Sequence, residues 1–170
     1  MNKPLVTLQL ATREDETPLA NLLELYLHDM SETFPIRISE QGRFGYAWLP
    51  TYWAEPERRF PYLIHSEHGL SGFVLATIGS PASENPDALD VAEFFVLRRL
   101  RRSGVGQAAI RQLWDERPGH WVVRVSEGNQ GGRAFWAKAV ADYSAGVFTE
   151  RSTPGRHFPW RVYELDSTRR

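Results

Sequence analysis

The most regular hydrophobic pattern in the chain lies between residues 16 and 30. Apolar side chains recur there at helical spacing, at Leu19, Leu22, Leu23, Tyr26, Leu27 and Met30. Because this spacing places all of them on one face, the stretch predicts an amphipathic helix that packs on a core. Thr12 or Asp15 can cap the helix, and Pro18 is tolerated within its first turn.

Shorter apolar runs predict strands over residues 5–11, 61–66, 72–79, 90–97, 120–126, 146–151 and 160–165. The second and third of these are close enough in the chain to form a hairpin. The fourth and fifth are separated by a helical pattern. A strand, a helix and a strand in this order imply a right-handed crossover between two parallel strands.

Two helices are predicted in the second half of the chain. The first covers residues 107–116 and ends at Pro118-Gly119. Its buried stripe consists of Val105, Ala109, Ile110, Leu113 and Trp114. The second begins after Asn129, and one of its faces carries Trp136, Ala139, Val140 and Tyr143, with Phe135 at the border.

Residues 31–59 show no sustained period. The segment holds three prolines, two glycines and six aromatic residues, and a second short helix is expected after Ser39. Long irregular connections often carry function. The pattern therefore leaves two interpretations open: a packed loop with aromatic anchors, or one wall of a binding site.

Length and composition narrow the class of protein. A chain of 170 residues suits a single domain over 1–170. Its formal net charge of −1 gives no general attraction for nucleic acid or an anionic membrane. The lack of cysteine excludes disulfides, zinc–thiolate sites and a cysteine nucleophile. Without a signal-peptide pattern or a long apolar run, we expect a cytoplasmic monomer or homodimer.

The stretch over residues 90–106 carries the clearest chemistry. A strand leads through four arginines into the turn Ser103-Gly104-Val105-Gly106, where a helix begins. The first N–H groups of a helix have no intrahelical acceptor, and the helix dipole favours negative charge there. Glycine lets the backbone approach a ligand closely. The stretch therefore predicts a site for a phosphate-bearing ligand.

The spacing Arg101-x-x-Gly104-x-Gly106, after a strand, resembles the acetyl-CoA-binding motif of the GNAT superfamily of N-acetyltransferases. A second block is similar to the same family and comprises Asn129, Ala134, Phe135, Trp136 and Lys138. The order of predicted elements also matches. The resemblance implies the GNAT α/β fold: a mixed sheet of about seven strands, helices on both faces, and the fourth and fifth strands splayed around the cofactor.

The resemblance also implies the roles of individual residues. Acetyl-CoA would be bound by Phe95, Val96, Leu97, Arg101, Arg102, Ser103, Gly104, Val105, Gly106, Gln107 and Asn129. The backbone N–H of Val96 would stabilise the oxyanion that forms at the thioester. Asn129 would bond the pantetheine arm, although its position also suits a helix N-cap.

Glu93 is the candidate base. Strand alternation predicts that Val91, Glu93, Phe95 and Leu97 face the same way, which puts a carboxylate among apolar side chains. The resemblance implies that Glu93 relays the amine proton through water. The alternative is an ion pair between Glu93 and an arginine on a neighbouring strand.

Trp136 stands where the family usually has a tyrosine that protonates the departing thiolate. An indole N–H donates hydrogen bonds but gives up no proton at neutral pH. Tyr143 lies two helical turns further on, too far to replace it. We therefore expect no tyrosine of the helix after Asn129 to act as the acid. Tyr26, in the first helix, is the reserve candidate. Its place on the apolar stripe of that helix is more typical of a core residue than of a catalyst.

The expected function is transfer of an acetyl group from acetyl-CoA to a primary amine of a small molecule or peptide by direct attack, without a metal. The alternative is a non-catalytic acetyl-CoA-binding or regulatory module. The glycine turn also fits a dinucleotide-binding fingerprint, with Glu127 in the place of the ribose-binding acid. Too few residues follow Glu127 to complete such a domain.

Overall fold

The computed structural model describes residues 4–168. In chain order the elements are β1 (Val6–Leu10), η1 (Arg13–Asp15), α1 (Glu16–Met30), α2 (Leu49–Ala54), β2 (Arg59–Ser66), β3 (Gly69–Ile78), β4 (Leu89–Val96), η2 (Arg98–Leu100), α3 (Val105–Glu116), β5 (His120–Ser126), α4 (Gln130–Tyr143), β6 (Thr149–Thr153) and β7 (Trp160–Asp166). No helix in this part of the chain combines the length and apolar character needed to cross a membrane.

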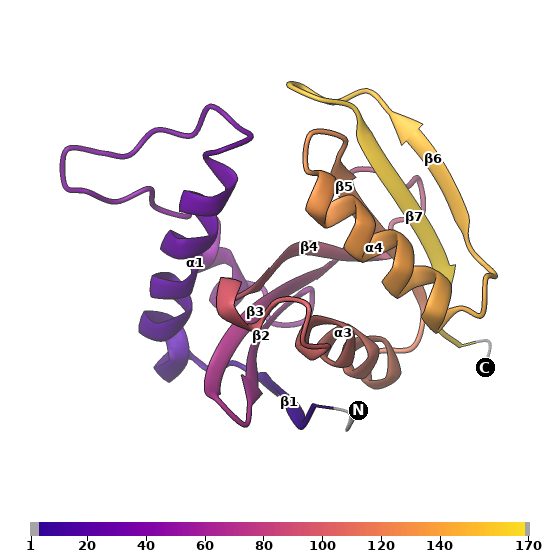
Figure 1. Cartoon of the computed structure of the whole chain (residues 1–170), viewed down its shortest axis with the longest axis horizontal. Coiled ribbons are helices and arrows are strands. Elements are labelled where there is room, and N and C mark those ends of the chain that lie inside the picture. The colour runs from indigo at the N-terminus through magenta and orange to yellow at the C-terminus, as the bar shows by residue number, and fades with distance from the viewer. Residues whose placement is uncertain (1–3, 169–170) are drawn as a thin grey trace.

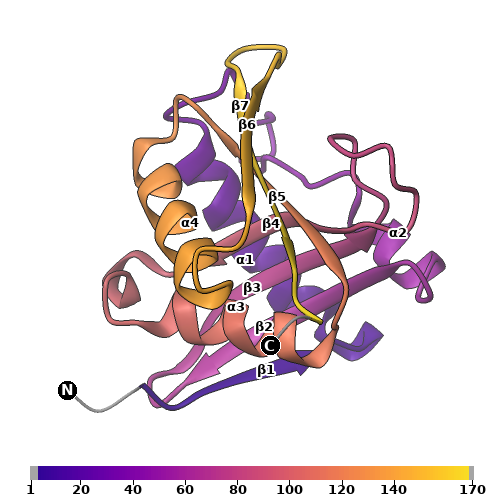
Figure 2. The same cartoon turned by 90° about the vertical axis from the view of Figure 1, so that its right-hand side faces the viewer.

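Within residues 4–168 the strands form one seven-stranded sheet in the order β1-β2-β3-β4-β5-β7-β6 (Figure 1). Neighbouring strands are antiparallel except β4 and β5, which run parallel. Helix α1 covers one face of the sheet, and α3 and α4 cover the other (Figure 2). This is the predicted α/β fold class, and the antiparallel pairs rule out the dinucleotide-binding alternative.

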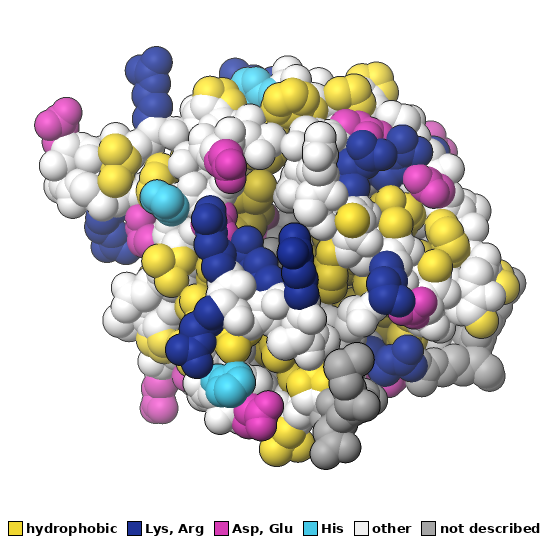
Figure 3. All heavy atoms as spheres, in the orientation of Figure 1, with side chains coloured by type: hydrophobic (Ala, Val, Ile, Leu, Met, Phe, Trp, Pro, Cys, Tyr) yellow, Lys and Arg dark blue, Asp and Glu magenta, His cyan; other side chains and the backbone are white. Residues whose placement is uncertain are grey.

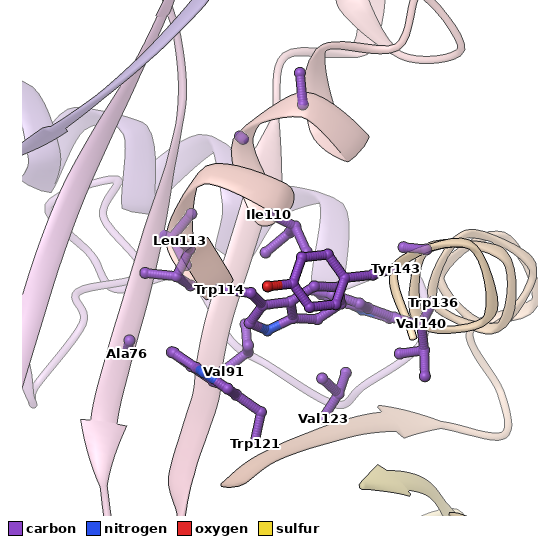
Figure 4. Close-up of a cluster of buried hydrophobic side chains, with 14 of the residues drawn as sticks. Ala76, Val91, Ile110, Leu113, Trp114, Trp121, Val123, Trp136, Val140 and Tyr143 are labelled. Atoms are coloured by element: carbon purple, nitrogen blue, oxygen red, sulfur yellow. The ribbon is translucent and has the colours of Figure 1, made fainter. Parts of the chain in front are cut away.

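The core lies on both faces of the sheet. On one face the predicted stripes of α3 and α4 pack on β4 and β5, where Trp114 and Trp121 are fully buried (Figure 4). On the other face Leu19, Leu22 and Leu23 of α1 pack on β2, β3 and β4. The spacing of apolar residues therefore predicted the correct buried face of each long helix.

The helix expected after Ser39 was placed wrongly. The Ser39 N–H donates to the Arg43 carbonyl at 2.9 Å, and the Gly42 N–H donates to the Ser39 carbonyl at 2.9 Å. These two hydrogen bonds close a turn. Helix α2 begins instead at Leu49, with Pro50 in its first turn, where a missing N–H costs nothing.

The alternation predicted for β4 was also wrong in part. Leu75 of β3 pairs with Glu93, but the next residue, Ala76, pairs with Val91, so Ala92 is an extra residue in a β-bulge. The bulge turns Val91 into the core beneath α3 and α4. Glu93 stays on the opposite face, and Asp90 joins it there because Asp90 pairs with Thr77, two residues from Leu75.

Candidate active site

A gap opens in the middle of the sheet between β4 and β5. The two strands pair along three positions, from Leu89 with Trp121 to Val91 with Val123. Both strands continue beyond this point, β4 to Val96 and β5 to Ser126. Within the described residues they no longer pair with each other there. The expected splay is therefore present, and it begins at the bulge.

The Val96 N–H points into this gap. Leu97, the next residue, donates its N–H to the Ser71 carbonyl on the β3 side at 2.9 Å. Along an antiparallel ladder, successive N–H groups point alternately toward and away from the partner strand. Since Leu97 points toward β3, Val96 points away from β3, toward the opening where β5 has separated.

The predicted phosphate site lies at the start of α3, on the face of the sheet that α3 and α4 cover. Gly104 is the N-cap and adopts a left-handed conformation with φ of 90°, which favours glycine. The first intrahelical bond runs from the Ala108 N–H to the Gly104 carbonyl at 3.0 Å. The N–H groups of Val105, Gly106 and Gln107 therefore have no intrahelical acceptor.

The four arginines before this turn have different environments. Arg98 and Arg101 both form ion pairs with Asp29 at the end of α1. Burial works to raise the pKa of Asp29, but the hydrogen bonds from these two arginines outweigh it and lower that pKa. Arg101 also donates from Nε to the Val96 carbonyl at 2.8 Å. The side chain of Arg102 is exposed next to the glycine turn, where it can contact an anion directly.

The other residues expected to bind the cofactor lie near this turn in different ways. The Asn129 Oδ1 accepts from the Gly132 N–H at 2.8 Å, so Asn129 is the N-cap of α4 and its amide nitrogen remains for another partner. The side chain of Val105 is buried in the core, and the Ser103 hydroxyl donates to the Leu100 carbonyl. The donors that these two residues can offer an anion are therefore their backbone N–H groups.

Glu93 lies on the opposite face of the sheet, beside the gap. Its carboxylate accepts hydrogen bonds from two phenols: Tyr26 of α1 and Tyr46, whose hydroxyl is 3.0 Å away. Burial raises the pKa of Glu93, while the two phenols work to lower it. The result is a carboxylate that is desolvated but held in place, as suits a base for protons on amines.

An arginine on a neighbouring strand exists, but it pairs with Asp90 and not with Glu93. Arg124 of β5 donates to the Asp90 carboxylate from Nε at 3.0 Å and from Nη2 at 2.6 Å. Asp90 is only 1% exposed and also accepts from the Ser80 hydroxyl at 2.7 Å. This bidentate pair ties β4 to β5 just before they separate.

A cleft of about 1140 Å³ joins the two faces through the gap. On one side it is lined by Gly104, Gly106, Gln107, Phe135 and Trp136, and on the other by Tyr26, Tyr46, Tyr52, Glu93, Arg124 and Trp160. Figure 3 shows basic side chains gathered around a hollow on one face of the molecule. Among residues 4–168, no cluster of three or more histidine or acidic side chains could hold a metal ion.

Trp136, Tyr143 and Tyr26, the residues considered for the role of the acid, lie in three different environments. Trp136 packs against Phe94 and Phe135, with ring centroids 5.2 and 4.9 Å away. Tyr143 donates to Asp115 at 2.9 Å, outside this cleft. Tyr26, expected mainly as a core residue, instead reaches Glu93. Tyr46 was not singled out from the sequence because its irregular segment has no period to orient it.

The phenols make a testable contribution to the pH dependence. Tyr26→Phe removes a donor to ionised Glu93, so the pKa of Glu93 rises further. If Glu93 is the base, the acid limb of the pH–rate profile moves to higher pH, and activity recovers as pH increases. Tyr62→Phe is the matched control, since Tyr62 donates to Glu116 away from the cleft. An unshifted limb in Tyr26→Phe would contradict this role.

The buried pair at the base of the gap makes a prediction on stability. Asp90→Ala leaves Arg124 without its partner and is expected to lower the free energy of unfolding by about 3–5 kcal/mol. The double change with Arg124→Met should recover part of that loss. Urea denaturation measures both, with the exposed Arg13→Ala as the control. Equal effects of Asp90→Ala and Arg13→Ala would refute it.

Comparison with known proteins supports the fold. No family model matches the sequence, and no curated protein matches it. Among solved structures, an aminoglycoside acetyltransferase in complex with coenzyme A is 17% identical, with a TM-score of 0.67 over 95% of this chain and 94% of that one. Spermidine N-acetyltransferase from Vibrio cholerae, with CoA and spermine, is 14% identical, with a TM-score of 0.61 over 96% of both chains.

A further structural neighbour from Desulfovibrio desulfuricans, assigned to the GNAT family of acetyltransferases, is 11% identical. Its TM-score is 0.63 over 95% of this chain and 99% of that one. The structural neighbours across nearly the full length are thus GNAT-family acetyltransferases, and the chain has their fold.

Proposed function

We propose that the chain transfers an acetyl group from acetyl-CoA to a primary amine of a small molecule or peptide. The observation that carries the proposal is the placement of Glu93. This partly buried carboxylate lies beside the gap on one face of the sheet, while the glycine turn and the start of α3 lie on the other. A donor bound on one face and an acceptor on the other would meet at the gap.

The residues on the α3 side fit acetyl-CoA. The N–H groups of Val105, Gly106 and Gln107 would hold its phosphates, with Arg102 alongside. The free amide nitrogen of Asn129 would serve the pantetheine arm. When bound, acetyl-CoA supplies an acetyl thioester. The Val96 N–H, which points into the gap, would donate to the oxygen on which negative charge develops.

The residues on the other face suit an amine. Alkyl ammonium groups titrate near pH 10, so the amine must lose a proton before its nitrogen can attack. Glu93 takes that proton, directly or through water, before the nitrogen bonds to the carbonyl carbon. The carbon–sulfur bond then breaks, and the second proton on the nitrogen passes to the departing thiolate or to water. The leaving thiolate has a conjugate acid of pKa about 8.5, as for a cysteine thiol, so it leaves without an acid at Trp136.

One observation favours a second candidate, a non-catalytic CoA-binding module. Trp136 occupies the position of the usual acid and cannot donate a proton. Release of free CoA thiol from acetyl-CoA across a panel of amines separates the two candidates. Turnover with any amine supports the enzyme. Tight CoA binding by calorimetry, with no thiol released by any amine, favours the module.

A further inference from the structure

We infer that the acceptor is a compact primary amine with a single positive charge and a planar, mostly apolar body. This inference rests on the proposed function and specifies its acceptor. It follows from the charges and the aromatic side chains that line the α1 side of the cleft, and it separates this acceptor from polyamines and aminoglycosides, which carry several ammonium groups.

The charges allow for one ammonium group. Four carboxylates line the cleft: Asp29, Glu32, Asp90 and Glu93. Two of them are neutralised, Asp29 by Arg98 and Arg101, and Asp90 by Arg124. Glu32 is exposed at the rim, and its charge acts on Arg98. Glu93 is partly buried and forms no ion pair within residues 4–168, so it is the carboxylate that can receive an ammonium inside the cleft.

Two further cations on this side, Arg59 and Arg124, already have partners. Arg59 pairs with Glu55 at 2.9 Å and lies over the ring of Tyr52, 5.6 Å from its centroid. Arg124 forms an ion pair with Asp90. A second ammonium on the acceptor would therefore be desolvated beside arginines that are already paired, without a carboxylate of its own, which is costly.

The walls around Glu93 are aromatic. Tyr26 and Tyr46 contact its carboxylate, and Tyr52 of α2 is 2% exposed beside them. Trp48, just before α2, lines the cleft with 62% of its surface exposed. Faces of aromatic rings attract both a cation and a flat apolar group.

A second group of aromatic side chains lines the same side of the cleft. Trp160 of β7 lies below the Arg124 guanidinium, with 5.8 Å to the ring centroid. Phe34, from the segment after α1, stacks on Trp160 with centroids 6.4 Å apart. These two groups of aromatic rings leave a site suited to a flat body, with one carboxylate to hold the amine.

The test measures CoA thiol release with acceptors that differ in one feature. Pentylamine and cadaverine share a chain and differ in the second ammonium, and phenethylamine adds a ring. Phenethylamine should have a kcat/KM at least about tenfold above that of cadaverine or spermidine, with pentylamine between. Trp48→Ala should lower kcat/KM for phenethylamine more than for pentylamine. Val147→Ala, an exposed site outside the cleft, is the control.

The outcomes distinguish the two claims. Turnover that favours cadaverine, spermidine or an aminoglycoside overturns the acceptor class and leaves the proposed function intact. If no amine releases thiol, the proposed function fails, and binding of the same amines measured by tryptophan fluorescence then decides the acceptor class. Preferential binding of phenethylamine supports it, and equal or weaker binding than cadaverine overturns it.

Discussion

Glu93→Gln is expected to lower acetyl transfer at neutral pH by about 10²–10⁴-fold, the usual contribution of a general base. Gln keeps the shape of the side chain and can still hydrogen-bond the phenols of Tyr26 and Tyr46, but it cannot take a proton. CoA affinity should stay the same, because the phosphate site lies on the other face of the sheet. Turnover and CoA calorimetry on the same protein measure both quantities.

The stability of this variant separates a catalytic role from a structural one. Burial raises the folded-state pKa of Glu93, so ionised Glu93 opposes folding once the pH exceeds its unfolded-state value. A neutral Gln removes that cost, and the melting temperature at neutral pH should be unchanged or higher. A lower melting temperature with normal turnover would show that Glu93 serves the fold.

Glu116→Gln is the matched control for this experiment. Glu116 also accepts a hydrogen bond from a phenol, that of Tyr62 at 2.9 Å, but it does not line the cleft. Its turnover should equal that of the unmodified protein. A comparable loss of turnover in both variants would mean that the effect is not specific to the site.

Gly104→Val is expected to weaken CoA binding by at least about 100-fold, because two charge-assisted contacts to backbone N–H groups contribute about 1.5–3 kcal/mol each. Gly104 has φ of 90°, which valine adopts only at a cost, so the turn that presents the N–H groups must change. Gly106→Val is less informative, since a Cβ there would lie 3.1 Å from the Phe135 ring and disturb packing.

Gly146→Val carries the same backbone strain away from the site. Gly146 has φ of 83°, and a Cβ there would have nothing within 4 Å. Calorimetry should find normal CoA affinity in Gly146→Val. The loss of stability should be comparable in Gly104→Val and Gly146→Val. Equal CoA affinity in the folded Gly104→Val and Gly146→Val proteins would overturn the phosphate-site assignment.

Local patterns in the sequence predicted the parts of the structure that depend on near neighbours. The buried faces of α1, α3 and α4 follow from apolar spacing of three and four residues, and the glycine turn follows from its motif. The orientation of β4 does not, because the bulge at Ala92 is a property of its pairing with β3. Alternation alone therefore placed Val91 on the wrong face.

The partners of Glu93 were also beyond reach of the sequence pattern. Tyr26 and Tyr46 lie 67 and 47 residues from it along the chain, and Tyr46 belongs to a segment without a period. An arginine on a neighbouring strand was considered as its partner. The arginine that the structure places there, Arg124, pairs instead with Asp90, because the bulge turns Asp90 to the same face as Glu93. The packing of α1 and of the segment before α2 on the sheet brings the carboxylate and its two phenols together.

A crystal structure of the CoA complex tests the central claim most directly. The account predicts the pyrophosphate at the N–H groups of residues 105–107 and the thiol in the gap between β4 and β5, within hydrogen-bond distance of the Val96 N–H. Glu93 should face the thiol from the α1 side. CoA bound elsewhere on the protein, or with its thiol outside the gap, would contradict the account.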